Sequence, residues 1–332
     1  MTVGRIGPAG APADGPVVRL RALSSVALRT TELDGSADFY REVWGLTPSD
    51  SEPDLVSLRG AGPEHHILQL VGAEANGLDK LSFAVRTRHE IDRAARGLER
   101  LGVPIVQGPG LLDQVGGGYG LRLVDPEGRL VELSCDTWAV VPKDPAGLDA
   151  VPSKLAHVVL NTVDIDAACE FYTSVLGMRI SDWSEHQMAF LRCNSDHHVI
   201  AFNQASWTSV NHVAYEMASI DHFMRAIGRL RHHSVIPLWG PGRHGPGNNT
   251  FSYFADPAGL VCEYTSDVMR VDEDAWQCHV WRRTPELSDL WGTAGPPSAD
   301  TRSHMAGVPD PGYLARQASL RTDDPAMSRT AR

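Results

Sequence analysis

Hydrophobic and polar positions alternate with two different periods along the chain, and the changes of period outline short strands and helices. Residues 157–162, HVVLNT, form an apolar, β-branched run that predicts a strand. Residues 164–177, DIDAACEFYTSVLG, begin with Asp, place apolar residues at helical spacing and end with Gly, which predicts a helix. Further strand-like runs follow at 178–183, 187–194 and 197–204. This quarter of the chain is therefore predicted to be one βαβββ unit.

The next quarter repeats that order of elements. A strand is predicted at 210–217 and a helix at 219–233. Strands are again predicted at 235–240, 249–259 and 260–267. The second half of the chain thus consists of two βαβββ units in tandem.

The first half of the chain is a diverged copy of the second. The segment LSSVALRTTELDGSADFYREVWGL from Leu23 aligns with LAHVVLNTVDIDAACEFYTSVLGM from Leu155. The turn sequence DPEGRLVE from Asp125 aligns with DPAGLVCE from Asp256, at nearly the same offset. A fixed offset over several anchors is the signature of an internal repeat. The sequence predicts an α+β fold of four βαβββ units in two tandem domains.

The domain boundaries follow from changes in composition. We expect a flexible leader over residues 1–18, an N-terminal domain over 19–140 and a C-terminal domain over 151–290, joined by a loop rich in Pro and small residues. The tail, 291–332, becomes polar and mixed, and we expect it to be partly disordered or packed against another subunit.

Charge and cysteine usage exclude several partners. The chain of 332 residues has a net charge of −11 and no basic run, which argues against a nucleic acid partner. No apolar stretch approaches the roughly 20 residues that cross a bilayer, so no membrane association is expected. The leader lacks the apolar middle of a signal peptide. The five cysteines form no CxxC pair, which favours a reducing, cytoplasmic location.

The order of the four units resembles the vicinal oxygen chelate superfamily, and more narrowly its type I extradiol ring-cleaving dioxygenases. The resemblance covers roughly residues 20 to 290. In that family two βαβββ units curl into an open barrel around one metal. The resemblance therefore implies two tandem open-barrel domains of the glyoxalase, bleomycin resistance and dioxygenase type.

Three residues of the second half form a candidate metal site. His157, His212 and Glu263 lie in predicted strands, and two His with one carboxylate are the ligand set of non-haem Fe(II) oxygenases. The repeat provides an internal control, because the corresponding residues of the first half are Ser25, Ser82 and Glu132. Since the fold itself does not need His at these places, we expect metal only in the C-terminal domain. Fe(II) is the expected ion, and Mn(II) shares the same ligands.

Two further residues come from the run GRHGPGNNTFSYF. It resembles the segment before the metal Glu in extradiol dioxygenases, where a His and a Tyr reach the bound catechol. The resemblance implies these roles for His244 and Tyr253. The first half has Leu112 and Arg122 near the matching places.

The resemblance also implies a His that acts as acid–base catalyst on the strand near residue 200. His198 precedes His212 by 14 positions, which matches the family spacing, and is the candidate. The first half carries a matching pair, His65 and His66, so a double His can exist there without metal. Because side chains alternate along a strand, only one of His197 and His198 is expected to face the cavity.

The resulting hypothesis is an extradiol dioxygenase that cleaves the ring of a catecholic aromatic with O₂, as a homodimer or homotetramer. Arg192 and Arg243 are candidates for contact with an acidic substituent, but the sequence does not identify the catechol. Two alternatives stay open. One is a metal-dependent isomerase or lyase of the glyoxalase type, and the other is a non-catalytic binding protein of the bleomycin-resistance type.

Overall fold

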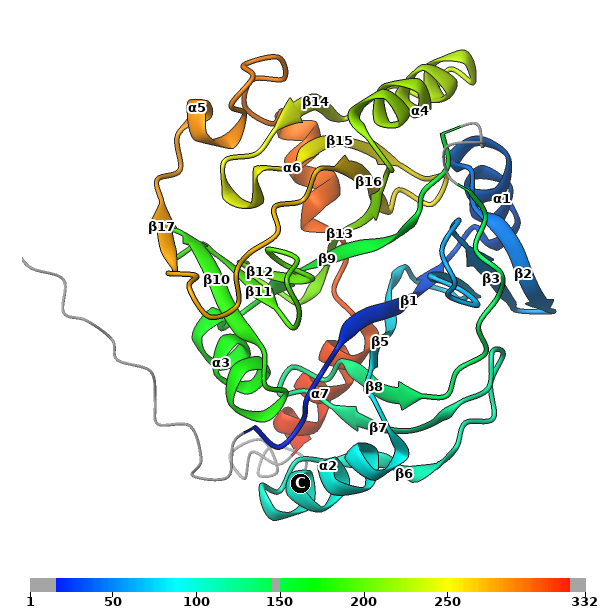
Figure 1. Ribbon diagram of the computed structural model, residues 1–332, viewed down its shortest axis with the longest axis vertical. Coiled ribbons are helices and arrows are strands. Elements are labelled where there is room, and N and C mark those ends of the chain that lie inside the picture. The colour runs from blue at the N-terminus through cyan, green and yellow to red at the C-terminus, as the bar shows by residue number, and fades with distance from the viewer. Residues whose placement is uncertain (1–15, 145–149, 323–332) are drawn as a thin grey trace, which may run out of the picture.

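The computed structural model describes residues 16–144 and 150–322 and has two sheet domains side by side (Figure 1). The strands of the N-terminal domain form one sheet in the order β2-β3-β4-β1-β5-β8-β7-β6. Its strands are β1 (Ala22–Thr30), β2 (Thr47–Glu52), β3 (Leu55–Arg59), β4 (Leu68–Gly72), β5 (Gly77–Ala84), β6 (Ile105–Leu111), β7 (Tyr119–Val124) and β8 (Leu130–Cys135). Its helices are α1 (Leu33–Asp38), η1 (Phe39–Trp44) and α2 (Arg88–Arg100).

The C-terminal domain repeats this arrangement with the order β14-β15-β16-β13-β9-β12-β11-β10-β17. Its first eight strands are β9 (Lys154–Thr162), β10 (Arg179–Ser184), β11 (Met188–Arg192), β12 (Ile200–Gln204), β13 (Ser209–Glu216), β14 (Trp239–Arg243), β15 (Thr250–Ala255) and β16 (Val261–Ser266). Its helices are α3 (Ile165–Glu170), η3 (Phe171–Val175), α4 (Ile220–His232) and η4 (Pro246–Asn248). The predicted α+β fold of four βαβββ units is confirmed.

The helical segment after β9 begins and ends at the residues that its sequence predicts. Asp164 caps α3, because its Oδ1 accepts a hydrogen bond of 3.0 Å from the main-chain N–H of Ala167. Gly177 follows η3 with a φ of 72°, a conformation that glycine adopts without strain. These two residues set the beginning and the end of the helical segment between β9 and β10.

A C-terminal segment follows β16 and has no counterpart in the N-terminal domain. It contains β17 (His279–Trp281), α5 (Pro285–Ser288), α6 (Ala299–Ala306) and α7 (Pro311–Thr322). β17 pairs with β10, and Asp310 before α7 accepts a hydrogen bond of 2.9 Å from the main-chain N–H of Leu78. We expected residues 291–332 to be partly disordered or packed on another subunit. Met305 and Asp310 contact the same chain through hydrogen bonds to Asn161 and Leu78, and residues 323–332 lie outside the described residues, so the expectation for this tail stays a prediction.

The repeated Asp-Pro-x-Gly turns hold the two domains together. In the N-terminal domain, Arg129 donates a hydrogen bond of 2.7 Å to the main-chain oxygen of Asn161, at the start of the other domain. In the C-terminal domain, Asp256 accepts a hydrogen bond of 3.1 Å from the hydroxyl of Ser36. Each turn therefore contacts the opposite domain, which explains why both halves keep it.

The two turns differ in charge, and this difference predicts a pH dependence of stability. Asp125 pairs with Arg129 at 3.1 Å, whereas the residue matching Arg129 is Leu260. Burial raises the pKa of Asp256 to about 6, above the usual value for an unfolded chain. The folded state then binds this proton more tightly, so the contribution of Asp256 to stability is fully present below about pH 4 and is lost as the pH rises to about 6.

We expect Asp256→Asn to remove this loss. As the pH rises from 4 to 7, the free energy of unfolding of the wild type should fall by about 3 kcal/mol relative to that of the variant. Each unit by which the pKa is raised is worth about 1.4 kcal/mol. Urea unfolding of both proteins across this pH range measures the difference. A difference that does not change with pH would contradict the assignment.

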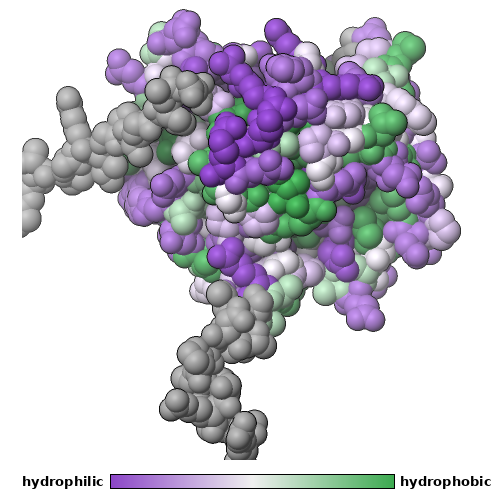
Figure 2. Space-filling model, turned by 90° about the horizontal axis from the view of Figure 1, so that it is seen from below, coloured by the Kyte–Doolittle hydropathy of each residue, from purple (hydrophilic) through white to green (hydrophobic). Residues whose placement is uncertain are grey.

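The surface mixes hydrophilic and hydrophobic residues. Hydrophobic residues gather near the middle of the face seen in Figure 2, between hydrophilic ones. Large apolar side chains are also exposed near the end of the N-terminal domain and in the loop that follows it, among them Trp138 and Val141, which are 63 % and 85 % exposed. Among the described residues no helix is long and apolar enough to span a membrane. The homodimer or homotetramer stays a prediction.

Candidate functional site

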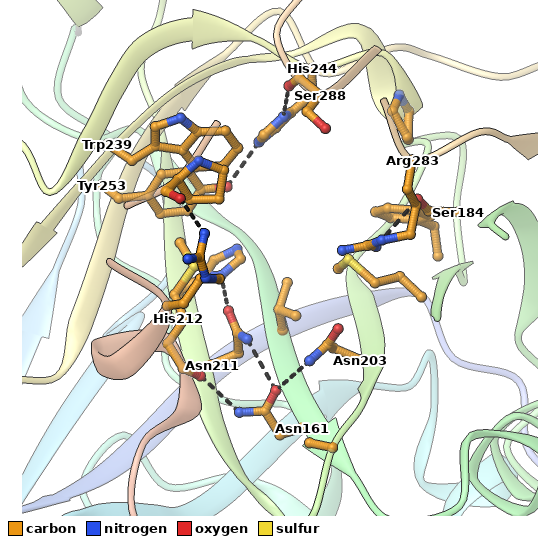
Figure 3. A pocket seen from close by; sticks show the side chains of 18 of the residues that line it. Asn161, Ser184, Asn203, Asn211, His212, Trp239, His244, Tyr253, Arg283 and Ser288 are labelled. Carbon is orange, nitrogen blue, oxygen red and sulfur yellow. Dashed lines mark hydrogen bonds between the residues drawn. The ribbon is translucent and has the colours of Figure 1, made fainter. Parts of the chain in front are cut away.

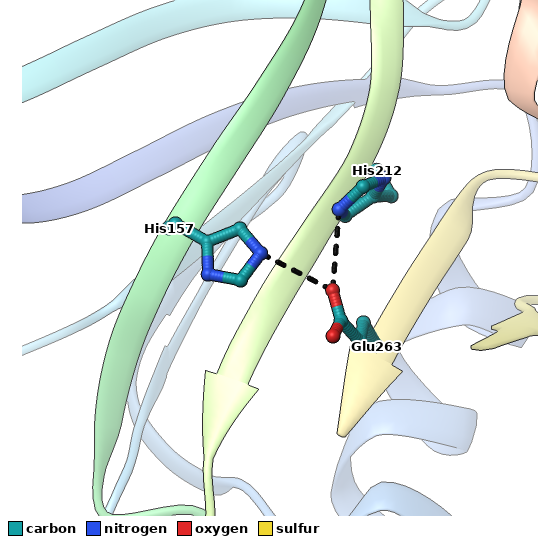
Figure 4. Close-up of side chains that lie close together, drawn as sticks. All are labelled: His157, His212 and Glu263. Atoms are coloured by element: carbon teal, nitrogen blue, oxygen red, sulfur yellow. Dashed lines mark hydrogen bonds and ion pairs between the residues drawn. The ribbon is translucent and has the colours of Figure 1, made fainter. Parts of the chain in front are cut away.

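Three adjacent strands bring His157, His212 and Glu263 together (Figure 4). β13 lies between β9 and β16, and Ala214 on β13 is the register partner of both His157 and Glu263. His212 lies two residues before Ala214 and therefore on the same face of the sheet. The ligand atoms of the three residues all lie within 4.8 Å of one another. Alanine at position 214 leaves room between them.

The acid at the centre of this cluster is fully buried. Oε2 of Glu263 lies 3.2 Å from Nε2 of His157 and 3.2 Å from Nε2 of His212. Although burial alone raises it, the two histidines lower the pKa of Glu263 to about 2. Oε1 of Glu263 and Nδ1 of His157 are buried and have no hydrogen-bond partner among the described residues. The cluster therefore has an ionised carboxylate, and two of its polar atoms make no hydrogen bond with the described residues.

His198 joins the cluster, and His197 turns away from it. The ring of His198 lies 4.3 Å from that of His157, between centroids, and lines the cavity. Nε2 of His197 donates to the buried carboxylate of Asp182 at 3.0 Å, and its Nδ1 lies 3.1 Å from Nδ1 of His198. Because Asp182 only accepts, His197 carries its proton on Nε2, and Nδ1 of His198 donates to it. The lone pair of His198 is then on Nε2.

β17 fixes the outer end of this chain. Its residues Trp281 and His279 donate hydrogen bonds of 2.7 and 2.8 Å to Asp182, through the indole N–H and the main-chain N–H. Although burial opposes the shift, hydrogen bonds from His197 and Trp281 keep the pKa of Asp182 lowered. Burial and the neighbouring histidines lower the pKa of His198 well below its usual range. His198 is therefore neutral at pH 7 and able to accept a proton.

His244 and Tyr253 form a pair on the other side of the cluster. Nδ1 of His244 donates to the main-chain oxygen of Ser288 at 2.9 Å, so its Nε2 accepts from the Tyr253 hydroxyl at 2.9 Å. The Tyr253 ring lies 4.9 Å from that of His212. Burial lowers the pKa of His244 to about 4 and raises that of Tyr253 well above its usual value. The pair is a neutral imidazole and a protonated phenol.

A cavity of about 480 Å³ opens over these residues (Figure 3). Its walls include apolar and aromatic side chains from several strands: Val159, Met188, Phe190 and Trp239. Arg282, Arg283 and Arg302 of the C-terminal segment also line it. The six residues selected from the sequence are brought to one place: His157, His198, His212, His244, Tyr253 and Glu263.

Arg192 and Arg243, the sequence candidates for contact with an acidic substituent, do not line the cavity. Arg192 is buried and donates to the Ser181 hydroxyl at 3.0 Å, and Arg243 donates to Asn248 at 2.9 Å. Neither is among the described residues that line the cavity. Asn161 and Asn211 also line the cavity, although neither was selected from the sequence. Alternation from His157 could have found Asn161, but Asn211 lies in a β-bulge that turns it toward the cavity beside His212.

In the N-terminal domain, the acid that corresponds to Glu263 is Glu132, and its partner is the charged amino group of Lys80. Lys80 Nζ lies 2.9 Å from Oε2 of Glu132, and Arg122 Nε lies 2.9 Å from the same atom. Ser82 and Gln114 lie 3.3 and 3.1 Å from the other carboxylate oxygen. Although burial opposes it, Lys80 and its neighbours lower the pKa of Glu132. Glu132 thus forms an ion pair with Lys80, whereas the corresponding acid of the C-terminal domain, Glu263, faces two histidines.

We expect Lys80→Met to destabilise the fold without changing the metal content. Removing one partner of a buried pair leaves an uncompensated charge and typically costs about 3–5 kcal/mol. Arg122 still faces Glu132, so we expect the lower end of that range. Denaturant unfolding measures the loss, and the double variant with Glu132→Gln should recover part of it. A loss of bound metal in Lys80→Met would show instead that this half holds an ion.

Comparisons with known proteins agree with this architecture. The model of the Glyoxalase/Bleomycin resistance protein/Dioxygenase superfamily matches residues 22–133 and 154–264. Metapyrocatechase 2 of Cupriavidus necator is 28 % identical over 280 residues, covering 78 % of this chain and 84 % of that protein. The iron-dependent extradiol dioxygenase of Rhodococcus jostii is 24 % identical over 301 residues, covering 82 % and 96 %.

A solved structure is also similar. The Mn(II)-bound glyoxalase from Novosphingobium aromaticivorans is 39 % identical, with a TM-score of 0.81, and the match covers 85 % of this chain and 94 % of that one. The two matched stretches of the family model correspond to the two sheet domains. The chain therefore belongs to the Glyoxalase/Bleomycin resistance protein/Dioxygenase superfamily, with one such domain in each half.

Proposed function

We propose that this protein is an extradiol dioxygenase that cleaves a catecholic ring with O₂ at a non-haem Fe(II). The convergence of His157, His212 and Glu263 beneath one cavity carries the proposal. Two relatives named above, metapyrocatechase 2 and the iron-dependent extradiol dioxygenase, support it across most of the chain. Both atoms of O₂ enter the product, so that a catechol and O₂ give a ring-opened semialdehyde or ketone acid.

The donor set fits a divalent ion. Two imidazole Nε2 atoms and one ionised carboxylate face a common point, and Oε1 of Glu263 has no hydrogen-bond partner among the described side chains. Three protein ligands on one face leave positions for other ligands. A bound Fe(II) would acidify a coordinated hydroxyl and bring the catechol and O₂ together. Mn(II) fits the same donors, and the similar Novosphingobium structure holds this ion.

The neighbouring side chains can manage protons and charge. His198 is neutral, and its Nε2 lone pair can take a proton from a catechol hydroxyl and return it to an oxygen atom later in the cycle. Tyr253 keeps its proton, and when its O–H turns from Nε2 of His244 toward the cavity it can donate a hydrogen bond to a substrate oxygen as negative charge develops there. His244 holds the Tyr253 hydroxyl in place at 2.9 Å. The apolar side chains Val159, Met188, Phe190 and Trp239 line the same cavity and could pack against an aromatic ring.

A second candidate is a metal-dependent isomerase of the glyoxalase type. The 39 % identity to a structure described as a Mn(II)-bound glyoxalase favours it. Such isomerases usually use a fourth protein ligand. Among the described His, Cys, Asp and Glu residues only three converge here, which favours the dioxygenase.

Oxygen consumption separates the candidates. The full-length protein is loaded with Fe(II) without air and mixed with a panel of simple, biaryl and carboxylated catechols in an oxygen electrode. We expect one O₂ per catechol and a product that absorbs at longer wavelength than the catechol. Isomerisation of a substrate without O₂ uptake would support the glyoxalase type. Catechol binding without turnover in the metal-loaded protein would support a binding protein.

A further inference from the structure

A chain of amide side chains connects His212 to the C-terminal end of α6 (Figure 3). Asn161 lies on β9, and Asn211 lies on β13 beside His212. Both amides are buried, with Asn161 only 1 % and Asn211 only 9 % exposed. Most buried amide groups are hydrogen-bonded, and because an amide N–H only donates and an amide oxygen only accepts, the partners of each group give the direction of its bonds.

The end of α6 fixes the orientation of Asn161. Its Nδ2 lies 2.8 Å from the main-chain oxygen of Met305 and 3.3 Å from that of Ala306. Carbonyl oxygens only accept hydrogen bonds, so the NH₂ group of Asn161 must face α6. Its Oδ1 therefore points the other way and accepts hydrogen bonds from Asn203 at 2.9 Å and Asn211 at 3.0 Å.

The same argument fixes Asn211 and then His212. Because the NH₂ group of Asn211 is used by Asn161, its Oδ1 faces Nδ1 of His212 at 2.8 Å. An amide oxygen only accepts, so the proton of the neutral imidazole must be on Nδ1. Nε2 of His212 then has its lone pair directed to the side where Oε2 of Glu263 lies, at 3.2 Å.

We propose that α6 sets the tautomer of His212 through Asn161 and Asn211, and that these two asparagines are positioning residues for the metal ligand. The inference rests on the proposed function only in taking His212 as a ligand. Partners of this kind orient ligating histidines and keep the coordinating nitrogen unprotonated. The C-terminal segment, which also lines the cavity, is thereby linked to His212, although the main-chain oxygens of Met305 and Ala306 bond to Asn161 and not to His212.

The N-terminal domain lacks this chain, as it lacks the histidines. The residues matching Asn161 and Asn211 are Arg29 and Leu81, and Arg29 instead faces Asp79 at 3.4 Å. The amides are thus found only in the half with the candidate ligands. This contrast argues against a role in the shared fold alone.

Metal affinity and the tautomer test the proposal together. The full-length variants Asn161→Leu, Asn211→Leu and the double variant keep side-chain size but remove the amides. Competition with a chelator gives the dissociation constant for Co(II) and Mn(II). We expect each single change to weaken binding by about 10- to 100-fold, and the double variant to lose no more than the larger single loss. Asn203→Leu is the matched control, because Asn203 donates to the same oxygen of Asn161 but is not part of the chain to His212. The metal affinity of this variant should equal that of the wild type.

The ¹⁵N spectrum of histidine-labelled apoprotein gives a second readout. The His212 signal, identified by its absence in His212→Gln, should show a protonated Nδ1 in the wild type and a mixture of tautomers in Asn161→Leu. A wild-type apoprotein with the proton on Nε2 would overturn the proposal even if the Leu variants fail to fold. Unchanged metal affinity in Asn161→Leu, or additive losses in the double variant, would also overturn it. If the wild type binds metal with this tautomer but consumes no O₂ with catechols, the proposed function fails and the inference stands.

Discussion

Glu263→Ala, His157→Ala and His212→Ala should each strip the full-length protein of most of its metal while leaving it folded. Changing a residue that only orients a ligand already costs about 10- to 100-fold in affinity, so losing a ligand should cost more than about 100-fold. The fold should persist because β9, β13 and β16 are held by continuous main-chain pairing and by the opposite, apolar faces of these strands. Metal analysis after purification, together with circular dichroism, measures both effects.

The N-terminal domain provides the control for this prediction. Glu132→Gln removes the matching carboxylate, which faces Lys80 and Arg122 and no histidine ligand pair. We expect this variant to keep the same metal content as the wild type, even though it loses stability. Retention of full iron by all three ligand variants would rule out the site. A second metal per chain that disappears in Glu132→Gln would show that both domains bind an ion.

The repeat made the fold and the convergence of the candidate ligands predictable from the sequence. Two copies of the same pattern define which positions the fold requires, and His157 and His212 stand out because their counterparts are serines. Strand alternation then places Val159 and Asn161 on the cavity face with His157. The register that puts Ala214 opposite both His157 and Glu263 follows from pairing within the repeat.

The supporting hydrogen bonds could not be predicted in the same way. They depend on the C-terminal segment, which lies outside the repeat and shows no periodic signal. Trp281 of β17 fixes Asp182, and the end of α6 fixes Asn161, across separations of 99 and 144 residues. Strand alternation does not predict the direction of the Asn211 side chain, because a β-bulge interrupts the strand at this residue. Long-range contacts of this kind depend on where a segment packs, which neither spacing nor composition encodes.

The same segment therefore reaches the site through three hydrogen-bond chains of defined direction, and one of them runs from Ser288 through His244 to Tyr253. Of the other two, one ends at His212 and leaves its Nε2 lone pair free, and the other ends at His198 and leaves its Nε2 free to accept a proton. The chain to His212 begins at an acceptor of the segment itself, the Met305 carbonyl. The chain to His198 begins at the Asp182 carboxylate of β10, which Trp281 and His279 of the segment hold by donating to it. Because each chain begins at a group that only accepts, every following side chain donates an N–H to the residue before it. The last histidine of each chain therefore donates from Nδ1, and its Nε2 lone pair is left on the cavity side.

His198→Asn should lower turnover by about 10²- to 10⁴-fold, the range that general acid–base assistance supplies, while leaving metal content unchanged. His198 contacts the ligand His157 but is not itself one of the three converging donors, so the ion should stay bound. The loss should be larger for electron-rich catechols, whose second hydroxyl ionises less readily without a base. Steady-state rates and iron content of the same preparations measure both quantities.

The matched control is His66→Asn in the N-terminal domain. His66 and His65 repeat the contact between Nδ1 atoms, at 3.2 Å, but the carboxylate beside them, Glu132, is paired with Lys80. We expect this variant to keep its turnover, because no candidate ligands face His66. Equal damage from His66→Asn and His198→Asn would show that the pair is structural in both halves. Damage from His197→Asn should be smaller than from His198→Asn, since His197 acts only by orienting its neighbour; the reverse order would place the proton relay at His197.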